Sequence, residues 1–550
     1  MNYSKWYYVL PVDLIIITSF TVAQDTKVIL EVASQKKIAY DFILTNQLVL
    51  GEFEFTKEVH AIEIQQGLRF DIDCEEYPGL HYDLQIPEVP YVISDDRIFF
   101  TDDAPKDETF LTISLSGQSY FQCIISGHLQ EAPASISSYV SFEKEKNLYI
   151  DFYQQLNRNF YLKSSEESLQ TQLEILNQTA WWYSHNAMVH FADPHGLEQP
   201  GGAAWGTRDV CQGPMEYFLA TQNYELAGKI LLNIFSHQNS GTGEWPQWFM
   251  FDRYQKDAGE CHGDVVFWPL KSIGDYIKCS SDYSLLQERI PYAEGEERKE
   301  TLLQHIKVAF SAIQKRFINN SGLLTYAGGD WDDTLQPADP SMKEHLISSW
   351  TVALAYQTLN SLSQLIRPVD IDFSALLSER AAFIRRDFSS LLIQDGVIAG
   401  FARQEKEGFT YILHPSDKET DIGYRLIPMT RSIIAELVEP FQANNNMDII
   451  HRELKFPDGV RLMNKPAHYS GGISKLFKRA EQAANVGREI SLQYTHAHIR
   501  YIEACAKLGD AQSAWEGLFT VNPIRIQQAV PSASRRQSNM YFSSSDGFYR

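Results

Sequence analysis

A chain of 550 residues is too long to fold around one hydrophobic core, so we expect roughly two to four domains. Of its residues, 44% are hydrophobic and 21% are charged, which is typical of a soluble globular protein. A formal net charge of −22 at pH 7 argues against nucleic acid or an anionic membrane as a partner. An anionic substrate would therefore need a locally basic pocket.

The N-terminal residues 6–23 are mostly apolar and follow Lys5, as in a weak signal peptide. Pro11 and Asp13 interrupt this run, and no clear cleavage site of small residues follows it. We therefore favour a strand inside a β-domain over a signal peptide. No run of about 18 uncharged apolar residues occurs anywhere, so no segment is expected to span a membrane.

Short runs rich in β-branched and aromatic residues continue to about residue 155, separated by Gly, Pro, Asp and Asn. They are residues 27–32, 38–44, 113–116, 120–125 and 148–152. This pattern predicts an antiparallel β-sandwich over residues 1–158. The pattern then becomes helical: Ser164 and Glu167 form a capping box, and Leu169, Leu173 and Leu176 follow at helical spacing. We expect a helical linker over residues 159–182.

Helices with loops rich in Gly, Pro and aromatic residues follow this linker. One apolar stripe includes Leu226, Ile230 and Ile234, and a second helix is expected to begin at Asp339-Pro340 and run to about Leu359. A further helix is expected over residues 494–508, before Gly509 and the capping residue Asp510. Helix pairs joined by long loops indicate an α/α toroid over residues 183–550.

The six cysteines are scattered, with no Cys-x-x-Cys pair and no Cys/His spacing typical of a metal site. They are typical of reduced thiols, so we expect a cytoplasmic protein without a metal site.

A loop with crowded acids carries the sequence Gly-Gly-Asp330-Trp331-Asp332-Asp333. Carboxylates this close repel one another, which favours the protonated form of at least one of them, as a general acid requires. The indole between them offers an apolar face of the kind that packs against a sugar ring. A solvated acidic turn or a calcium-binding loop explains the same residues about equally well when the loop is considered alone.

A series of motifs shifts this balance toward catalysis. In chain order they are Gly201-Gly-Ala-Ala-Trp205-Gly-Thr-Arg208-Asp209, Gly263-Asp264-Val-Val-Phe-Trp268-Pro269, Gly329-Asp330-Trp331-Asp332-Asp333 and Gln493-Tyr494-Thr495-His496. Together they resemble the cellobiose phosphorylase family of inverting glycoside phosphorylases, over roughly residues 160–550. Gly196-Leu-Glu198-Gln199 and the run Ser543-Ser-Ser-Asp546 are similar to the branch of that family that acts on β-1,2-linked glucans.

The resemblance implies that Asp333, the second Asp of the family's Asp-Trp-Asn-Asp motif, is the general acid. Phosphate is already an anion at neutral pH, so it attacks the anomeric carbon without a general base. Asp332 stands where the cellobiose-acting relatives usually carry Asn. Its charge would further favour the protonated form of Asp333, or it marks a different acceptor subsite.

The resemblance also implies residues that hold the sugar and the phosphate. Arg208 and Asp209 match family residues that bind the nonreducing-end sugar. His496 matches the phosphate-binding histidine, and Arg431 is a candidate for further positive charge there. Outside these motifs, an Arg-Asp dipeptide is usually a surface ion pair and a lone histidine on a helix is usually structural.

Other residues of these motifs are candidates for contact with sugar. Trp205 and Trp331 are candidate stacking walls, although either side chain can equally belong to a core. Asp330 and Asp332 are candidates to bind hydroxyl groups or to tune the acid.

The fold that the resemblance implies is an N-terminal antiparallel β-sandwich, a linker helix and an (α/α)6 barrel. A Thr-Gly loop that also binds phosphate in the family should lie beyond Arg550. We therefore expect the barrel to be incomplete at its C-terminus and the chain to be a fragment of a longer protein. An inactive glucan-binding fragment is accordingly one alternative to an enzyme.

The expected reaction is phosphorolysis of a β-linked glucooligosaccharide, with a β-1,2-glucan as the expected substrate, to α-glucose 1-phosphate and a shortened chain. Inorganic phosphate is the co-substrate, no metal or organic cofactor is expected, and a homodimer is expected from the family. The rival is an inverting hydrolase on the same fold. It would need a second carboxylate, Asp264 or Glu260, about 6.5–9.5 Å from the acid.

Overall fold

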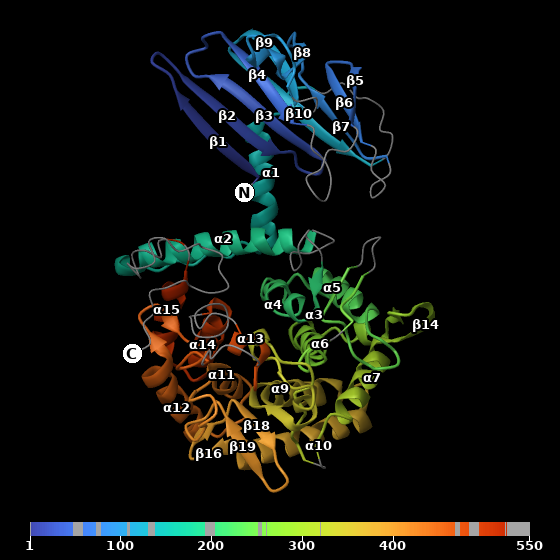
Figure 1. Ribbon diagram of the computed structural model, residues 1–550, viewed down its shortest axis with the longest axis vertical. Coiled ribbons are helices and arrows are strands. Elements are labelled where there is room, and N and C mark those ends of the chain that lie inside the picture. The colour runs from blue at the N-terminus through green and yellow to red at the C-terminus, as the bar shows by residue number, and fades with distance from the viewer. Residues whose placement is uncertain are drawn as a thin grey trace. The chain divides into compact units, whose positions relative to one another are not determined.

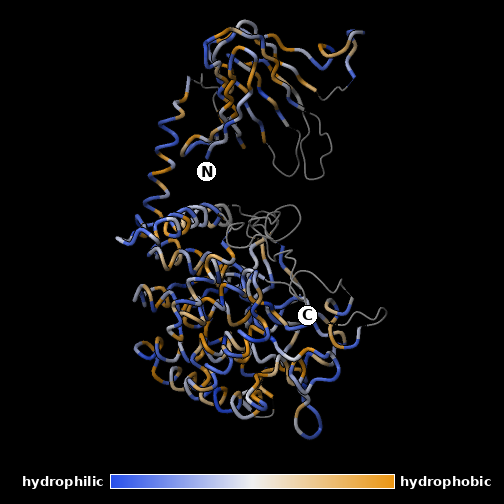
Figure 2. The backbone as a smooth tube through the Cα atoms, turned by 90° about the vertical axis from the view of Figure 1, so that its left-hand side faces the viewer, coloured by the Kyte–Doolittle hydropathy of each residue, from blue (hydrophilic) through white to orange (hydrophobic). Residues whose placement is uncertain are grey.

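The computed structural model of the protein describes residues 2–47, 59–72, 79–106, 110–129, 138–192, 204–250, 256–259, 261–318, 321–467, 474–482, 494–522 and 524. The chain forms two compact units, Met1–Asn159 and Phe160–Arg550. Figure 1 labels their helices and strands. Figure 2 shows that short apolar and polar stretches alternate along the chain in both units, as expected where each element has one buried face.

The first unit is a sandwich of two antiparallel sheets. One sheet has the order β1 (Tyr3–Val9), β2 (Leu14–Thr21), β3 (Lys27–Ser34), β10 (Tyr120–His128), β7 (His81–Gln85), β6 (Gly67–Ile72) and β5 (Val59–Ile64). The other has the order β4 (Tyr40–Gln47), β9 (Phe110–Gln118) and β8 (Val92–Asp95). Both sheets contribute to one core, which includes Val32, Phe70, Leu84, Leu115 and Phe121. The predicted antiparallel β-sandwich is therefore confirmed.

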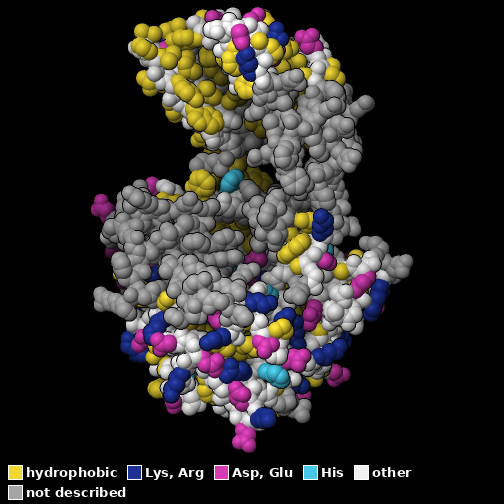
Figure 3. Space-filling view, viewed as in Figure 1, with side chains coloured by type: hydrophobic (Ala, Val, Ile, Leu, Met, Phe, Trp, Pro, Cys, Tyr) yellow, Lys and Arg dark blue, Asp and Glu magenta, His cyan; other side chains and the backbone are white. Residues whose placement is uncertain are grey.

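The N-terminal apolar run forms the hairpin of β1 and β2, in which Tyr3 pairs with Phe20 and Val9 pairs with Leu14. The interrupting residue Asp13 lies at the turn, where its carboxylate accepts hydrogen bonds from the Leu14 backbone N–H (2.8 Å) and the Ser34 hydroxyl (2.6 Å). β1 is an edge strand, and Trp6, Tyr7, Tyr8 and Val9 are exposed. Figure 3 shows hydrophobic side chains gathered on this part of the first unit.

The strand predicted at residues 148–152 is wrong, because these residues lie inside helix α1 (Phe142–Leu156). Ser141 caps this helix and accepts a hydrogen bond from the Lys144 backbone N–H (3.4 Å). Tyr153 and Leu156 are buried together with Glu145. The cap and the helix formers that precede residue 148 outweigh the local β-propensity of the aromatic and β-branched residues.

The second unit is mainly helical. Its helices are α2 (Gln170–Ala192), α3 (Thr207–Val210), α4 (Gly213–Ala220), α5 (Tyr224–Ser236), α6 (Phe267–Ser280), α7 (Leu302–Gln314), α8 (Met342–His345), α9 (Ser349–Ile366), α10 (Ile371–Asp387), α11 (Leu426–Ile434), α12 (Pro440–Ile449), α13 (Lys478–Gln482), α14 (Thr495–Lys507) and α15 (Ala511–Val521). Its short strands are β11 (Trp205–Gly206), β12 (Trp248–Phe249), β13 (Arg289–Tyr292), β14 (Gly295–Thr301), β15 (Leu346–Ser348), β16 (Ile393–Gln394), β17 (Val397–Ile398), β18 (Phe401–Gln404), β19 (Phe409–Ile412), β20 (Lys455–Phe456) and β21 (Gly459–Val460).

The helices of this unit pack as pairs in two layers. α6, α9, α11 and α14 contact one another in that order, and α5, α10, α12 and α15 pack on them as their respective partners. Figure 1 shows α10, α12 and α15 at the periphery of the unit and α9, α11 and α14 nearer its centre. Inner and outer helices in alternation are typical of an α/α barrel, as predicted.

Two of the predicted helices are confirmed, and the start of a third is wrong. α5 carries the stripe with Ile230 and Ile234, and α14 is followed by α15, which Asp510 caps. The helix expected from Asp339 is broken, because α8 ends at His345 and β15 pairs with β18 before α9 begins. The Ser348 side chain caps α9, so the long helix begins at this residue and not at Asp339.

In the described part of the chain, no helix is both long and apolar enough to cross a membrane. The five cysteines in that part are unpaired thiols.

Candidate active site

The acidic loop lies between a tight glycine contact and a short 3₁₀ helix, Asp333–Leu335. Gly329 has φ +152°, and a Cβ there would lie 3.1 Å from the ring of His262. A side chain at this position would therefore be strained and would displace the histidine. The Gly329 carbonyl accepts a hydrogen bond from the Gly263 backbone N–H (2.9 Å), which ties this loop to the Gly263-Asp264 motif.

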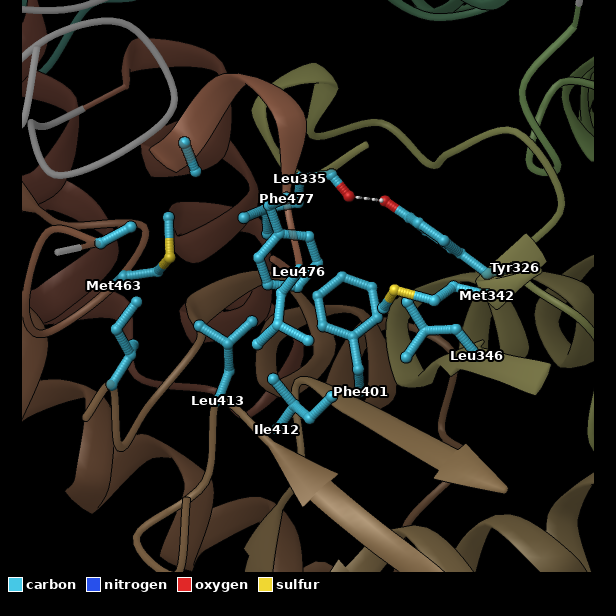
Figure 4. Packing of buried hydrophobic residues seen from close by; sticks show 13 residues of the cluster. Tyr326, Leu335, Met342, Leu346, Phe401, Ile412, Leu413, Met463, Leu476 and Phe477 are labelled. Atoms are coloured by element: carbon cyan, nitrogen blue, oxygen red, sulfur yellow. Dashed lines mark hydrogen bonds between the residues drawn. The ribbon is translucent and has the colours of Figure 1, made fainter. Parts of the chain in front are cut away.

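A buried apolar cluster holds the far side of the same loop. The Tyr326 hydroxyl donates a hydrogen bond to the Leu335 carbonyl (2.9 Å), and both residues are fully buried. Figure 4 shows this bond and the packing of Phe401 and Phe477 beneath Leu335. The segment that carries Asp333 is thereby fixed at both ends.

Asp330 and Asp332 are fully buried and lie close to Arg425. The Arg425 guanidinium donates to both carboxylate oxygens of Asp330 (3.1 and 3.0 Å) and lies 3.7 Å from Asp332. Asp330 also accepts from the Ser348 hydroxyl (2.6 Å). Both acids are inaccessible, so this geometry favours an anchoring role over the sugar contact expected from the motif.

Asp333 is the partly exposed acid of the loop, and Arg208 binds it directly. Arg208 Nη2 lies 3.0 Å from Asp333 Oδ1, and Arg208 Nη1 donates to the Asp330 carbonyl (2.9 Å) and lies 3.4 Å from Asp264. Burial lowers the pKa of Arg208, but attraction to Asp264 and Asp333 outweighs this and raises it overall. A cationic neighbour also favours the ionised form of Asp333, opposite to the effect expected from crowding among the acids.

Two further acids complete this charge cluster. Asp209 follows Arg208 in α3, and its pKa is raised by burial and by the charges of Asp333 and Asp264, against the attraction of Arg208. Asp264 is fully buried, and burial raises its pKa although Arg208 lowers it. The Asp264 carboxylate also accepts a hydrogen bond from the Trp268 indole (2.9 Å). The structure therefore brings together the predicted residues Arg208, Asp209 and Asp333.

A pocket lies on the other side of Trp331. The Trp331 ring packs against Tyr494 (5.1 Å between ring centroids) and His496 (5.0 Å). The residues that line the pocket are Gln212, Trp331, Trp350, Ile427, Thr430, Arg431, His496, Ala497 and Arg500. The candidates Trp331, Arg431 and His496 thus share one pocket. Trp205 is buried against Phe249 (6.2 Å between ring centroids) and does not line it.

Two arginines at this pocket have donors without acceptors. Nε of Arg431 and Nε of Arg500 are buried and have no hydrogen-bond partner among the described residues. Arg431 Nη1 donates to Gln357 (2.9 Å), and Arg500 donates to Glu216 (2.9 Å) and Glu503 (2.9 Å). Burial and the neighbouring Arg500 lower the pKa of Arg431 to about 10. A buried donor without a partner costs free energy, so these two groups favour a bound acceptor.

The sequence-based prediction missed Arg500. It lies four positions after His496 in α14, so both side chains point from the same face of the helix. This spacing was the signal that could have identified it. The pKa of His496 is lowered to about 3, first by burial and then by Arg500, so its imidazole is neutral at pH 7.

One group in the described residues has the geometry to bind a metal. The ligand atoms of His451, Cys505 and Asp510 lie within 4.8 Å of one another. His451 Nε2 already bonds the Tyr501 hydroxyl (3.0 Å), and Asp510 caps α15. None of these residues lines the pocket described above. The motif residues Gly196–Gln199, Gly201–Ala203, Glu260 and Gln493 lie outside the described residues.

Comparison with known proteins matches both units. The model of the glycoside phosphorylase supersandwich domain matches residues 1–127. The model of the catalytic domain of the glycosyl hydrolase 94 superfamily matches residues 152–542. Among solved structures, a bacterial glucoamylase complexed with acarbose has a TM-score of 0.56 at 10% identity and covers 92% of this chain and 76% of its own. This last similarity concerns the fold alone.

Two relatives are informative at the level of sequence. The chain is 44% identical to 1,2-beta-oligoglucan phosphorylase of Listeria innocua over 565 aligned residues, which cover 100% of this chain and 50% of that protein. It is 25% identical to solabiose phosphorylase of Paenibacillus borealis over 240 residues, which cover 41% of this chain and 30% of that protein. The chain therefore spans about half the length of the first of these relatives.

Proposed function

We propose that this chain, which belongs to the glycosyl hydrolase 94 superfamily, carries the active centre of an inverting phosphorylase of β-linked glucooligosaccharides. The 44% identity to a 1,2-beta-oligoglucan phosphorylase supports a β-1,2 linkage as the preferred one. The products would be α-glucose 1-phosphate and a chain shortened by one glucose.

The observation that carries the proposal is the pair of buried arginines at the pocket beside Trp331. Their Nε donors lack partners among the described residues, and the neutral His496 adds a further hydrogen-bonding group. A phosphate would supply the missing acceptors, and charge-assisted hydrogen bonds of this kind are among the strongest in proteins. The positive charges are concentrated at the pocket although the chain has a net charge of −22.

In the proposed reaction, Asp333 gives its proton to the glycosidic oxygen while the bond from that oxygen to C1 breaks. A phosphate oxygen forms the new bond to C1 from the opposite face, so the β-linkage becomes an α-phosphate. Arg208 and Asp209 hold the hydroxyl groups of the reacting glucose. His496, Arg431 and Arg500 bind the phosphate.

A hydrolase on the same fold is less well supported. Its base would be Asp264 or Glu260, and Glu260 lies outside the described residues. Asp264 is fully buried and bonded to Trp268, so it is poorly placed to activate a water molecule. An inactive glucan-binding fragment would not require the paired donors at the pocket.

The test is the dependence of sugar release on orthophosphate. We expect a β-1,2-glucooligosaccharide to be consumed only when phosphate is present, with α-glucose 1-phosphate as product, and Asp333→Asn to lower kcat about 10²–10⁴-fold. Release of free glucose without phosphate would support the hydrolase instead. No turnover with a correctly folded protein would support the glucan-binding fragment.

Further features of the proposal stay predictions. Unpaired cysteine thiols support a cytoplasmic location. The homodimer, and a reaction that needs no metal or organic cofactor, rest on the resemblance to the family.

A further inference from the structure

We propose that His262 is a positioning residue for Asp333: its Nδ1–H group holds Oδ1 of the acid and leaves the catalytic proton to Oδ2. This inference rests on the proposed function, because it assigns a role to a neighbour of the proposed acid. His262 did not appear among the candidate residues of the motifs.

The contacts of the histidine place it at the centre of the acidic loop. His262 Nδ1 lies 3.1 Å from the carbonyl oxygen of Asp330 and 3.4 Å from Oδ1 of Asp333. Its ring packs against Gly329, where a Cβ would lie only 3.1 Å from it. Its backbone N–H donates to the Gln247 side chain (3.1 Å). The imidazole is therefore held in place from several sides.

The hydrogen-bond partners define which nitrogen carries the proton. A carbonyl oxygen can only accept, so Nδ1 must be the protonated nitrogen in its contact with Asp330. On the other side of the ring, the side-chain amide nitrogen of Gln336 lies 2.9 Å from Nε2, which accepts from it. Gln336 thereby fixes the Nδ1–H tautomer and the orientation of the ring, in the way that a second group commonly orients an imidazole.

This tautomer directs a donor toward one oxygen of the acid. Arg208 Nη2, at 3.0 Å, and His262 Nδ1, at 3.4 Å, both face Oδ1 of Asp333. Oδ1 accepts a hydrogen bond from Arg208 and faces the His262 N–H, which it shares with the Asp330 carbonyl. Both contacts disfavour a proton on Oδ1, so the proton that Asp333 transfers is assigned to Oδ2. The distance of 3.4 Å is long for a hydrogen bond, and such contacts commonly shorten when the substrate is bound.

The test compares two substitutions that differ in where they place a donor. The amide nitrogen of Asn can replace Nδ1, whereas that of Gln replaces Nε2. We expect His262→Gln to lower kcat on a β-1,2-glucooligosaccharide about 100-fold, and His262→Asn to stay within about 10-fold of the wild type. KM for phosphate should change in neither variant, because His262 does not line the phosphate pocket.

A second substrate separates positioning from a structural defect. 2,4-Dinitrophenyl β-glucoside has a leaving group that needs no proton, so His262→Gln should keep near wild-type phosphorolysis of it. An equal loss on both substrates would show a structural role and overturn the inference. Unchanged kcat of His262→Gln on the oligosaccharide would also overturn it.

The wild type and Asp333→Asn together show whether the proposed function or only the proposed role of His262 fails. If the wild type releases sugar without phosphate, or if Asp333→Asn stays fully active, the proposed function fails. If the wild type requires phosphate and Asp333→Asn is inactive on the oligosaccharide, while His262→Gln equals the wild type, only the role of His262 fails.

Discussion

Arg431 is the residue through which the phosphate proposal is most directly tested. Hydrogen bonds to charged groups contribute about 1.5–3 kcal/mol, so Arg431→Met should raise KM for phosphate about 10- to 100-fold. Steady-state phosphorolysis at saturating oligosaccharide measures this change. Arg452→Met is the matched control, since Arg452 is exposed and pairs with Glu453. An unchanged KM for phosphate in Arg431→Met would remove this arginine from the phosphate site.

Asp330 is expected to matter for stability rather than for sugar binding. Its ion pair with Arg425 is fully buried, so Asp330→Asn would leave the buried guanidinium with Asp332, at 3.7 Å, as its remaining carboxylate neighbour. We expect a loss of about 3–5 kcal/mol in the free energy of unfolding, measured by urea denaturation. Asp372→Asn, at an exposed position of α10, should change it little. Unchanged stability together with a raised KM for sugar would restore the sugar-contact role.

At the scale of single residues, the sequence predicts which side chains are candidates for the site better than it predicts which residues they contact. Motif order predicted that Arg208, Asp209, Asp333 and His496 belong to one site. The structure brings the first three together and places His496 in the pocket on the other side of Trp331. The partner of Asp330 is 95 residues away at Arg425, and nothing in the local sequence links the two. Such a pairing depends on the tertiary fold, so anchoring acids could not be separated from the reacting acid beforehand.

At the scale of single elements, α14 contains a buried histidine that should make stability depend on pH. His498 Nδ1 accepts from the Val460 backbone N–H (3.2 Å), and Nε2 donates to the Gly517 carbonyl (3.0 Å). Burial lowers the pKa of His498 to about 4 from its ordinary 6.5. Between these values the unfolded chain binds a proton that the folded chain does not, so stability is complete above pH 6.5 and is lost as the pH falls.

The expected size of this effect is about 1.4 kcal/mol per pH unit for one such group within that range. Urea denaturation at pH 7 and pH 5 should show a smaller pH dependence in His498→Gln than in the wild type. His345→Gln, at an exposed position of α8, serves as the control and should keep the wild-type dependence. An unchanged pH dependence in His498→Gln would contradict the assignment.

Helices were predicted correctly where the capping residues and the apolar spacing agree. They were predicted wrongly where pairing with a distant strand determines the structure. The cap at Asp510 and the stripe of α5 are local, and both are confirmed. β15 exists because Leu346 and Ser348 pair with Arg403 and Phe401 of β18, far along the chain. The apolar spacing after Asp339 continues through the residues of β15. Spacing alone therefore cannot distinguish this segment from a continuous helix.

At the scale of the whole molecule, each unit has buried hydrophobic residues of its own, so we expect separate thermal transitions in calorimetry. Phosphate should raise the transition temperature of the helical unit alone. At a phosphate concentration of 100 times Kd, it should stabilise this unit by about 2.7 kcal/mol. Asp330→Asn identifies that transition, because it should lower the same one. A rise of both transitions with phosphate, or of neither, would contradict a phosphate site confined to the helical unit.

The shared guanidinium of Arg208 has a consequence for the enzyme between turnovers. The group proposed to hold the glucose is, without sugar, bonded to the acid at 3.0 Å. That contact favours the ionised form of the acid, and a sugar hydroxyl group that binds Arg208 would weaken it and thereby favour the proton on Oδ2. In the proposed reaction, binding of glucose beside Arg208 would therefore also favour the protonated form that Asp333 needs as the acid.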